Sequence, residues 1–256
     1  MSSPSPSPSN TCLYCQGQLQ PFARFSSDRI VDVALTPQLK AALPELHYGR
    51  CDRCDSLIAT DIRLDANFDL LLLYQQLSPD YWSGLGTGHG DRFFAFLEQQ
   101  LNPQKLPLHL CDVGCGDGSF LRGLGNYWHK TGIEPGEPAA AMAVFAELAI
   151  APRVASATES EDAPGEVPAP PPTWIQGTLA TANLPPQSFD VITYIDVTEH
   201  LSDPLAELRQ ARQCLKPGGK LLLYTGNAQS PFAHLAGANW AYLRCAATWP
   251  SPPSRR

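Results

Sequence analysis

The sequence lacks any long hydrophobic run. Its longest leucine block, Leu70–Leu73, is four residues long, whereas a membrane-spanning helix needs about 20 apolar residues. The N-terminus, Met1–Pro8, alternates serine and proline, and has neither the basic nor the apolar segment of a secretory signal peptide. We therefore expect no membrane span, a disordered tail over residues 1–10, and a cytoplasmic protein with reduced thiols.

Basic residues are also scarce. The chain has 18 lysines and arginines against 25 aspartates and glutamates, and a formal net charge of −7. Proteins that grip a nucleic-acid backbone usually present a basic face, so this balance argues against nucleic acid and favours a small-molecule partner. No Gly-Lys-Ser/Thr sequence follows a glycine-rich turn, which excludes a Walker-type phosphate loop.

The 256 residues, 43% of them hydrophobic, leave room for one α/β domain and a small module. Residues 61–104 are expected to be a helical linker segment, with one helix over Phe93–Leu101. The domain is expected over 105–244, with a flexible proline-rich insertion at 151–172 and an irregular tail at 245–256. Strands are predicted at Leu108–Val113, Thr131–Glu134, Thr173–Gly177, Phe189–Val197 and Lys220–Thr225, and helices at Phe120–Trp128, Pro138–Ile150 and from Pro204 to the Pro217–Gly219 turn. This alternation predicts a doubly wound parallel sheet.

The first strand of the domain runs into a glycine-rich turn, Asp112-Val113-Gly114-Cys115-Gly116-Asp117-Gly118. Ligands of doubly wound sheets bind at the carboxyl ends of the strands, and Gly114 and Gly116 let the backbone approach a ligand closely. Glu134 ends the second strand twenty residues after Gly114, where a carboxylate can accept both hydroxyls of a ribose. The pattern predicts a nucleoside-binding site.

Two features separate the possible nucleoside ligands. Ser119 occupies the position at which a dinucleotide fingerprint needs glycine or alanine. Asp112 and Asp117 lie in a loop without lysine or arginine, so the loop would repel a pyrophosphate but suit a ligand with an ammonium and a sulfonium. The residues therefore favour S-adenosylmethionine, and a nicotinamide oxidoreductase is the weaker alternative.

Four motifs in order resemble those of class I S-adenosylmethionine-dependent methyltransferases. They are Asp112–Gly118, Gly132–Pro135, Phe189–Ile192 and Leu215–Gly219, within a resemblance that covers residues 65–244. The resemblance implies a Rossmann-like methyltransferase fold. It also implies that the methionine end of the cofactor is held by Asp112, Gly114 and Gly116, the ribose by Glu134, the adenine by Thr178 and Leu179, and the methionine amino group by Asp196.

A second polar segment, Asp196-Val197-Thr198-Glu199-His200, follows the fourth strand. It resembles the segment of ubiquinone-biosynthesis O-methyltransferases in which an acid-Glu-His set can hold a divalent cation. An acceptor hydroxyl would need its proton removed, and a histidine side chain, with a typical pKa of about 6.5, suits that task at His200. Glu199 and His200 are therefore candidate catalytic residues. A metal-ligand role and a purely structural role, capping and packing the following turn, are the alternatives.

Two Cys-x-x-Cys pairs lie within residues 11–60. They are Cys12/Cys15 and Cys51/Cys54, separated by 35 residues. Four thiolates suit tetrahedral Zn²⁺ and leave no open position, so the metal would be structural. The long spacing predicts a hairpin between the pairs, in a small zinc-ribbon-like module. Two disulfides are disfavoured by a reducing compartment, and a redox pair by the absence of a thioredoxin-like context.

A zinc module ahead of such a core resembles a bacterial group that includes sugar C-methyltransferases. Some rRNA methyltransferases also have such a module, but with histidine where this chain has Cys51 and Cys54. The leading prediction is methyl transfer to a small-molecule acceptor, such as a sugar, by in-line displacement. An rRNA methyltransferase, a non-catalytic cofactor-binding module and a zinc-dependent interaction module are the alternatives.

Class I methyltransferases continue after the fifth strand with a helix and a strand hairpin. Residues 245–256 resemble neither a strand nor a helix. We therefore expect the fold to lack its last strand hairpin, and the fifth strand to have an exposed edge that invites association.

Overall fold

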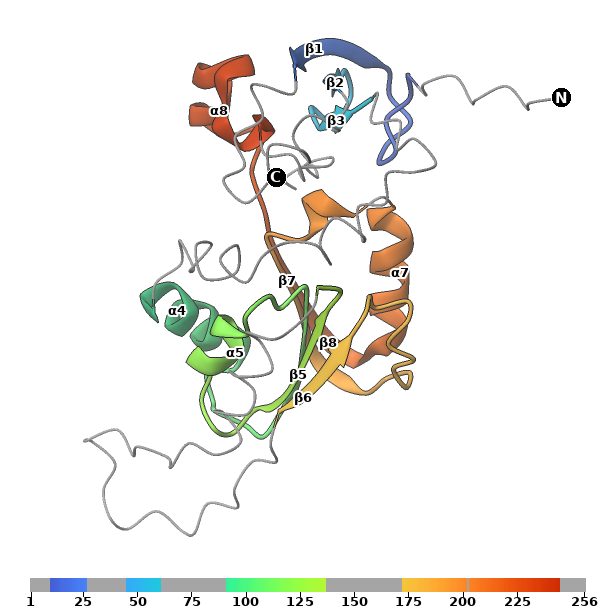
Figure 1. Cartoon of the computed structure of the whole chain (residues 1–256). Coiled ribbons are helices and arrows are strands. Elements are labelled where there is room, and N and C mark those ends of the chain that lie inside the picture. Colours follow the sequence, from blue (N-terminus) through green and yellow to red (C-terminus); the bar gives the residue numbers. More distant parts are fainter. Residues whose placement is uncertain (1–9, 27–44, 61–90, 137–171, 202, 245–256) are drawn as a thin grey trace, which may run out of the picture. The chain divides into compact units, whose positions relative to one another are not determined.

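The computed structural model describes residues 10–26, 45–60, 91–136, 172–201 and 203–244 (Figure 1). The chain forms two compact units. The first comprises Met1–Leu73, Asp196–Ala206 and Tyr224–Arg256, and the second Tyr74–Ile195 and Glu207–Leu223. Among the described residues, no helix is long and apolar enough to cross a membrane.

Several predictions from the sequence fall outside the described residues. These are the two tails (1–9 and 245–256), most of the helical linker (61–90), the helix at Pro138–Ile150 and nearly all of the proline-rich insertion (151–171).

The second unit is built on a five-stranded sheet in the order β6-β5-β4-β7-β8. The strands are β4 (His109–Val113), β5 (His129–Glu134), β6 (Thr173–Gln176), β7 (Phe189–Ile195) and β8 (Leu215–Tyr224). β4 pairs in parallel with both β5 and β7, and β5 pairs in parallel with β6. The chain therefore builds outward from β4 in both directions, which confirms the doubly wound fold and puts its topological switch point beside β4.

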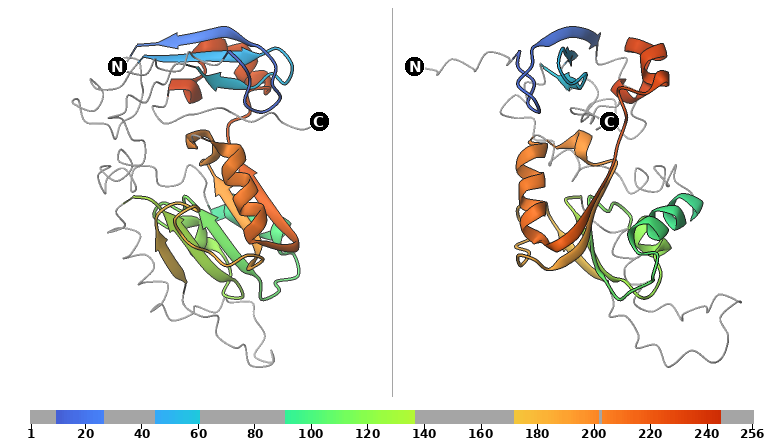
Figure 2. Two further views of the ribbon diagram at one scale, coloured as in Figure 1. Left: turned by 90° about the vertical axis from the view of Figure 1, so that its right-hand side faces the viewer. Right: turned by 180° about the vertical axis from the view of Figure 1, so that it is seen from behind.

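Helices cover both faces of this sheet. α4 (Asp91–Leu101) and α5 (Ser119–Gly123) lie on one face and α7 (Pro204–Cys214) on the other (Figures 1 and 2). Because both faces are covered, β4 and β7 are largely apolar along their length rather than alternating. The core cluster on the α4 side contains Phe94, Leu97, Leu101, Leu110, Phe120, Leu121 and Trp128.

The prediction of a helix over Phe120–Trp128 is wrong beyond Gly123. Leu124 is already extended, and the following turn is held by Glu98 of α4. One carboxylate oxygen of Glu98 accepts hydrogen bonds from Gly125 N, the Tyr127 hydroxyl and Trp128 Nε1, at 2.7, 2.7 and 2.9 Å. These tertiary hydrogen bonds compete with helix formation, and no local sequence pattern predicts them.

Strand boundaries also differ from the prediction, by one to five residues. β7 ends at Ile195 because Asp196 has a φ of 53°, which leaves the extended region. β8 starts at Leu215 and includes the Pro217–Gly219 stretch that we expected to be a turn. β8 is the last strand in the order of the described sheet, and its Leu221 and Leu223 are exposed.

The first unit contains an antiparallel sheet in the order β1-β2-β3. Its strands are β1 (Leu19–Phe25), β2 (Leu46–Cys51) and β3 (Leu57–Ala59). β1 and β2 pair between the two Cys-x-x-Cys sequences, as the predicted hairpin requires. Cys12, Leu19, Cys51 and Ile58 form one buried hydrophobic cluster of this unit.

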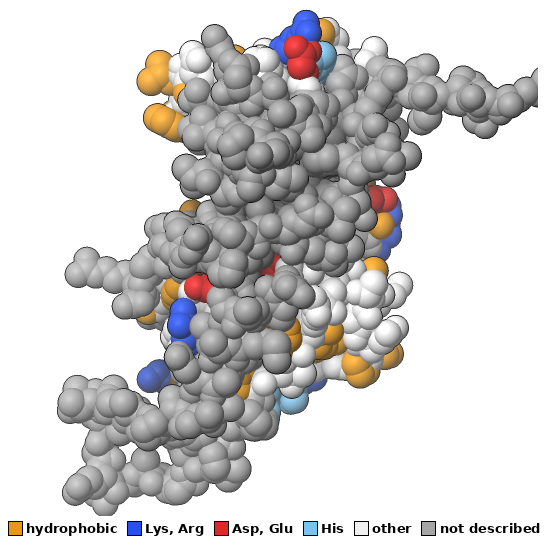
Figure 3. All heavy atoms as spheres, in the orientation of Figure 1, with side chains coloured by type: hydrophobic (Ala, Val, Ile, Leu, Met, Phe, Trp, Pro, Cys, Tyr) orange, Lys and Arg blue, Asp and Glu red, His pale blue; other side chains and the backbone are white. Residues whose placement is uncertain are grey.

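The described residues of the first unit also form four short helical segments: η2 (Thr198–His200), α8 (Pro231–Ala236), η3 (Gly237–Asn239) and η4 (Ala241–Arg244). Ser230 caps α8, since its hydroxyl accepts a hydrogen bond from Ala233 N at 3.1 Å, and Pro231 begins the helix. Phe232 and Leu235 of α8 are 68% and 88% exposed, and hydrophobic side chains project from this helix in Figure 3.

Candidate functional site

The glycine-rich turn after β4 adopts a backbone that only glycine favours. Gly114, Gly116 and Gly118 have φ angles of 69°, 53° and 75°. The turn folds back on the end of β5, because Ile133 O accepts hydrogen bonds from Gly114 N at 2.7 Å and Cys115 N at 3.1 Å. The three glycines are therefore needed for the path of the loop itself.

Glu134 lies at the end of β5 and closes onto this turn. Its two carboxylate oxygens accept hydrogen bonds from Gly116 N at 3.1 Å and Gly136 N at 3.0 Å. Burial raises the pKa of Glu134 to about 6, and the two backbone hydrogen bonds partly oppose that rise. The structure thus brings together the glycine loop and the acid that the sequence analysis assigned to the ribose.

Asp112, one residue before the end of β4, is also buried. Thr193 Oγ1 on the neighbouring strand β7 donates to it at 2.6 Å. Burial raises the pKa of Asp112 to about 7, the hydrogen bond from Thr193 lowers it, and the charge of Glu134 raises it further. No lysine or arginine of the described residues contributes to the pKa of either carboxylate.

Sequence reasoning missed Thr193. The available signal was a threonine within the apolar run of β7, at a position that pairs with Asp112 in the sheet. A buried hydroxyl normally finds a hydrogen-bond partner, so that residue could have been matched to a polar neighbour on the adjacent strand.

The turn after β6 contains Thr178 and Leu179, the residues assigned to the adenine. It is tied to β5, since Gly177 N donates to Glu134 O at 2.9 Å. It is also tied to α7, since Gln210 Nε2 donates to Leu179 O at 2.9 Å. The Leu179 side chain is fully buried, so it packs inside the unit, whereas Thr178 is partly exposed.

In the first unit, Asp196 begins the second polar segment. Its positive φ is uncommon outside glycine, although aspartate tolerates it better than most residues. Its N–H donates to Tyr224 O at 2.8 Å. Residues held in such backbone regions gather at functional sites, where the surrounding structure keeps them in place.

Glu199 is buried and both of its carboxylate oxygens are engaged. One accepts a hydrogen bond from Thr225 Oγ1 at 2.9 Å, and the other bonds the Tyr242 hydroxyl. The same hydroxyl accepts from Gly226 N at 2.8 Å. Sequence reasoning missed Thr225 and Tyr242, which are 26 and 43 residues away from Glu199 along the chain, because no local pattern connects them.

The neighbouring His200 is half-buried. Among the described residues, Asp196, Glu199 and His200 do not form a group that could hold a metal ion.

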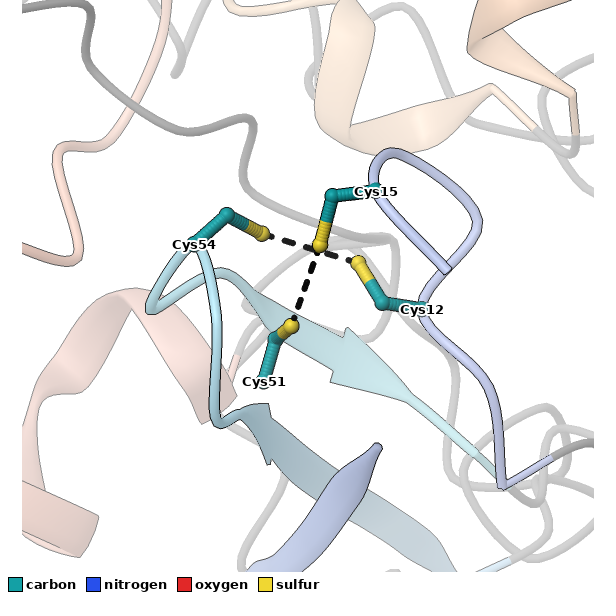
Figure 4. Close-up of side chains that lie close together, drawn as sticks. All are labelled: Cys12, Cys15, Cys51 and Cys54. Carbon is teal, nitrogen blue, oxygen red and sulfur yellow. Dashed lines mark hydrogen bonds between the residues drawn. The ribbon is translucent and has the colours of Figure 1, made fainter. Parts of the chain in front are cut away.

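The four cysteines of the two pairs do form such a group. All four Sγ atoms lie within 4.8 Å of one another and point inward (Figure 4). Cys12 and Cys54 are 3.6 Å apart and Cys15 and Cys51 are 3.4 Å apart, too far for a disulfide of about 2.05 Å. A tetrahedral Zn²⁺ with bonds of about 2.3 Å separates its sulfur ligands by about 3.8 Å. The spacing therefore fits zinc.

Comparison with known protein families agrees with the fold and with the glycine loop described above. The sequence profile of a family described as a methyltransferase domain matches residues 86–256, more than half of the chain. The chain belongs to this methyltransferase family.

Several relatives of the chain are named as methyltransferases. The ubiquinone biosynthesis O-methyltransferases of Pseudomonas putida (strain W619) and Pseudomonas paraeruginosa are 34% and 30% identical to the chain over 130 residues, which is 48% of the chain and 46% of each relative. This methyltransferase chain thus spans about half the length of those relatives. An S-adenosylmethionine-dependent methyltransferase of Aquifex aeolicus matches 60% of the chain with 76% of its own, at 16% identity and a TM-score of 0.43.

Proposed function

We propose that this methyltransferase domain binds S-adenosylmethionine and transfers its methyl group to a hydroxyl of a small molecule. The observation that carries the proposal is the pair of buried carboxylates, Asp112 and Glu134, at the glycine loop. Neither is neutralised by a basic residue of the described chain. A buried anionic pair favours a cationic ligand, because charge interactions strengthen as water is excluded.

The proposed contacts follow the motif positions. Glu134 holds the ribose hydroxyls, and the turn at Gly114 and Gly116 lies along the methionine end together with Asp112. The turn at Thr178 and Leu179 is proposed for the adenine, with Leu179 contributing backbone because its side chain is buried. Asp196 is proposed for the methionine amino group.

The bound donor supplies an electrophilic methyl group on a sulfonium. Methyl transfer is an in-line displacement, so the chain's task is to align donor and acceptor and to exclude water. We propose that His200 removes the proton of the acceptor hydroxyl, and that Glu199 holds the turn that carries His200. Both Glu199 oxygens already have partners, which favours this indirect role over that of a metal ligand.

The acceptor class rests on the relatives, which are named as O-methyltransferases of ubiquinone biosynthesis. We propose a hydroxyl acceptor on a small molecule, with sugars as the second class to be tested. The acidic net charge of −7 supports a small molecule over RNA.

Calorimetric titration with S-adenosylmethionine tests the donor site. We expect saturable binding that Glu134→Gln weakens at least tenfold, because the amide loses one of the two acceptors for the ribose hydroxyls. Asp190→Asn is the matched control. Asp190 lies near the start of β7, whereas Glu134 lies at the carboxyl end of β5, and Asp190 pairs with Lys216 at 2.7 Å. Absence of saturable binding by the unaltered protein would refute the proposal.

Transfer of a labelled methyl group to separate pools of phenols, sugars and RNA then tests the acceptor class. We expect label in the phenol pool and its loss in His200→Ala with donor affinity unchanged. Label in RNA alone would overturn the small-molecule assignment.

We also propose that Cys12, Cys15, Cys51 and Cys54 hold a structural Zn²⁺. The sulfur spacing fits, and backbone N–H groups support the ligands: Arg53 N donates to Cys51 Sγ at 3.4 Å. Native mass spectrometry should find one zinc per chain, lost in Cys51→Ser. A chain purified with zinc that retains none would contradict this assignment.

A further inference from the structure

Within the first unit, the second cysteine pair is bonded to the chain that follows β8. Gln229 Nε2 donates to the backbone carbonyl of Cys54 at 3.3 Å. The next residue, Asp55, pairs with Arg50 at 2.9 Å and lies 3.5 Å from His234 Nε2 on α8. Arg50 Nη1 is also 3.5 Å from His234 Nδ1. The turn that carries two of the four thiols is thus attached to α8 and to the residues just before it.

The same stretch of chain is attached at both its ends to Glu199. Thr225 Oγ1 and the Tyr242 hydroxyl bond the two oxygens of Glu199, and Gly226 N donates to the Tyr242 hydroxyl. A Cβ on Gly226 would stand 2.5 Å from the Tyr242 ring, so the ring lies directly on bare backbone.

The Tyr242 ring is held in turn by its neighbours. It stacks on Trp240 with centroids 5.0 Å apart and an angle of 17° between the rings, and both Trp240 and Leu243 are buried. These contacts leave the Tyr242 hydroxyl one position, between Glu199 and Gly226.

We infer that the four-cysteine cluster is an anchor that positions Glu199, with Tyr242 as the positioning residue that connects them. Metal bound by the cysteines holds the Cys54 turn, the Cys54 turn holds Gln229–His234, and this stretch sets Tyr242 and Thr225 against Glu199. The consequence is that zinc occupancy determines the placement of the η2 turn and of His200. The inference rests on the proposed zinc site, but not on donor binding or methyl transfer.

The physical reason is the small size of the module. Among the described residues, the hydrophobic cluster around the thiols contains Cys12, Leu19, Cys51 and Ile58 as its buried members, so two of the four are the cysteines themselves. Without metal, the coordinate bonds are lost and the four cysteines become free thiols. In a segment of this kind, those bonds account for most of the order. The Cys54 turn would then lose its fixed position, and the bond from Gln229 would lose its acceptor.

Hydrogen exchange followed by mass spectrometry tests the inference on the full chain. The comparison is between zinc-loaded protein and protein stripped by a chelator, with zinc content measured on both. We expect removal of zinc to speed exchange at least tenfold in peptides covering 196–201 and 225–244, the Gly226 amide included. A peptide covering 109–134, in the second unit, should exchange at the same rate in both samples.

Three variants separate positioning from general stability. Tyr242→Phe and Glu199→Ala should speed exchange in 225–244 while zinc stays bound. Glu199→Gln should restore the slow rate, since its amide can accept from Tyr242 and bond Thr225. Tyr127→Phe is the matched control, because it removes another tyrosine–glutamate hydrogen bond, of 2.7 Å, in the second unit. It should leave 225–244 unchanged.

The outcomes are distinct from those of the proposed function. Zinc-loaded and stripped protein that exchange alike in 196–201 and 225–244 would overturn the anchor alone, and would leave the zinc and donor proposals standing. A chain that binds no zinc overturns the zinc assignment and the anchor together. Donor titration on the same samples reports separately on the methyltransferase site.

Discussion

The hydrogen bond between Thr193 and Asp112 gives the sharpest test of the proposed donor site. Thr193→Val removes the hydroxyl and keeps the size and β-branching of the side chain. Because the bond stabilises the charged form of Asp112, its loss raises the pKa of Asp112 above the present value of about 7. A cationic donor needs the ionised carboxylate, so the variant should bind more weakly at neutral pH.

The size of the effect follows from the bond. A hydrogen bond to a charged group contributes about 1.5–3 kcal/mol, and one pKa unit corresponds to about 1.4 kcal/mol. Removal therefore raises the pKa of Asp112 by about one to two units, to about 8 or 9. The ionised fraction at pH 7 falls from about one half to between about one tenth and one hundredth, which weakens donor binding about 5- to 50-fold.

Titration calorimetry between pH 5.5 and 9 supplies the assay. The affinity of the unaltered protein should increase as pH rises through about 6 and about 7, where Glu134 and Asp112 lose their protons. The Thr193→Val curve should be displaced to higher pH and should approach the unaltered curve to within about twofold at pH 9. Equal affinities at pH 7, or an affinity that falls as pH rises, would refute the role given to the two carboxylates.

Three further predictions concern folding and solubility. Glu98→Ala leaves the buried Trp128 Nε1 and two other donors without their acceptor. The substitution should lower the free energy of unfolding by about 3 kcal/mol in urea titrations. A loss under about 1 kcal/mol would show that water replaces the carboxylate. Gly116→Ala puts a side chain at a φ of 53° in the loop. It should lower the free energy of unfolding by about 1–2 kcal/mol, measured by urea titration, and weaken donor affinity at least tenfold, measured by calorimetry. Unchanged donor binding would show that the loop is not part of the site. Leu223→Lys charges the exposed face of β8 and should reduce self-association in analytical ultracentrifugation, whereas an unchanged sedimentation profile would show that this strand does not mediate it.

Much of the second unit could be predicted because its signals are local. Short apolar runs separated by turn residues predicted all five strands and their parallel arrangement. The rule that ligands bind at the carboxyl ends of strands singled out the glycine loop and Glu134, and in the structure Gly116 N donates to Glu134 at 3.1 Å. The antiparallel pair between the cysteine pairs was predictable in the same way, since four thiols can share a metal only if the intervening chain turns back.

The error in the second unit has a different origin. The helix predicted to reach Trp128 ends at Gly123, because the carboxylate of Glu98 accepts hydrogen bonds from donors of the next turn. The catalytic role of Glu199 stays a prediction, to which the structure adds that its oxygens are engaged by Thr225 and Tyr242. In both places the partner side chain is distant in sequence, so no local pattern indicates it.

The sequence by itself determined the class of fold, the position of the glycine loop and the four thiols of the cluster, because periodicity, glycine conformation and ligand spacing act over a few residues. Only the tertiary structure decided which groups surround the buried acids. Asp112 is matched with Thr193 and Glu199 with Tyr242, while no basic residue of the described chain neutralises Asp112 or Glu134. Pairing of this kind depends on distances across strands and turns, which a one-dimensional pattern does not contain.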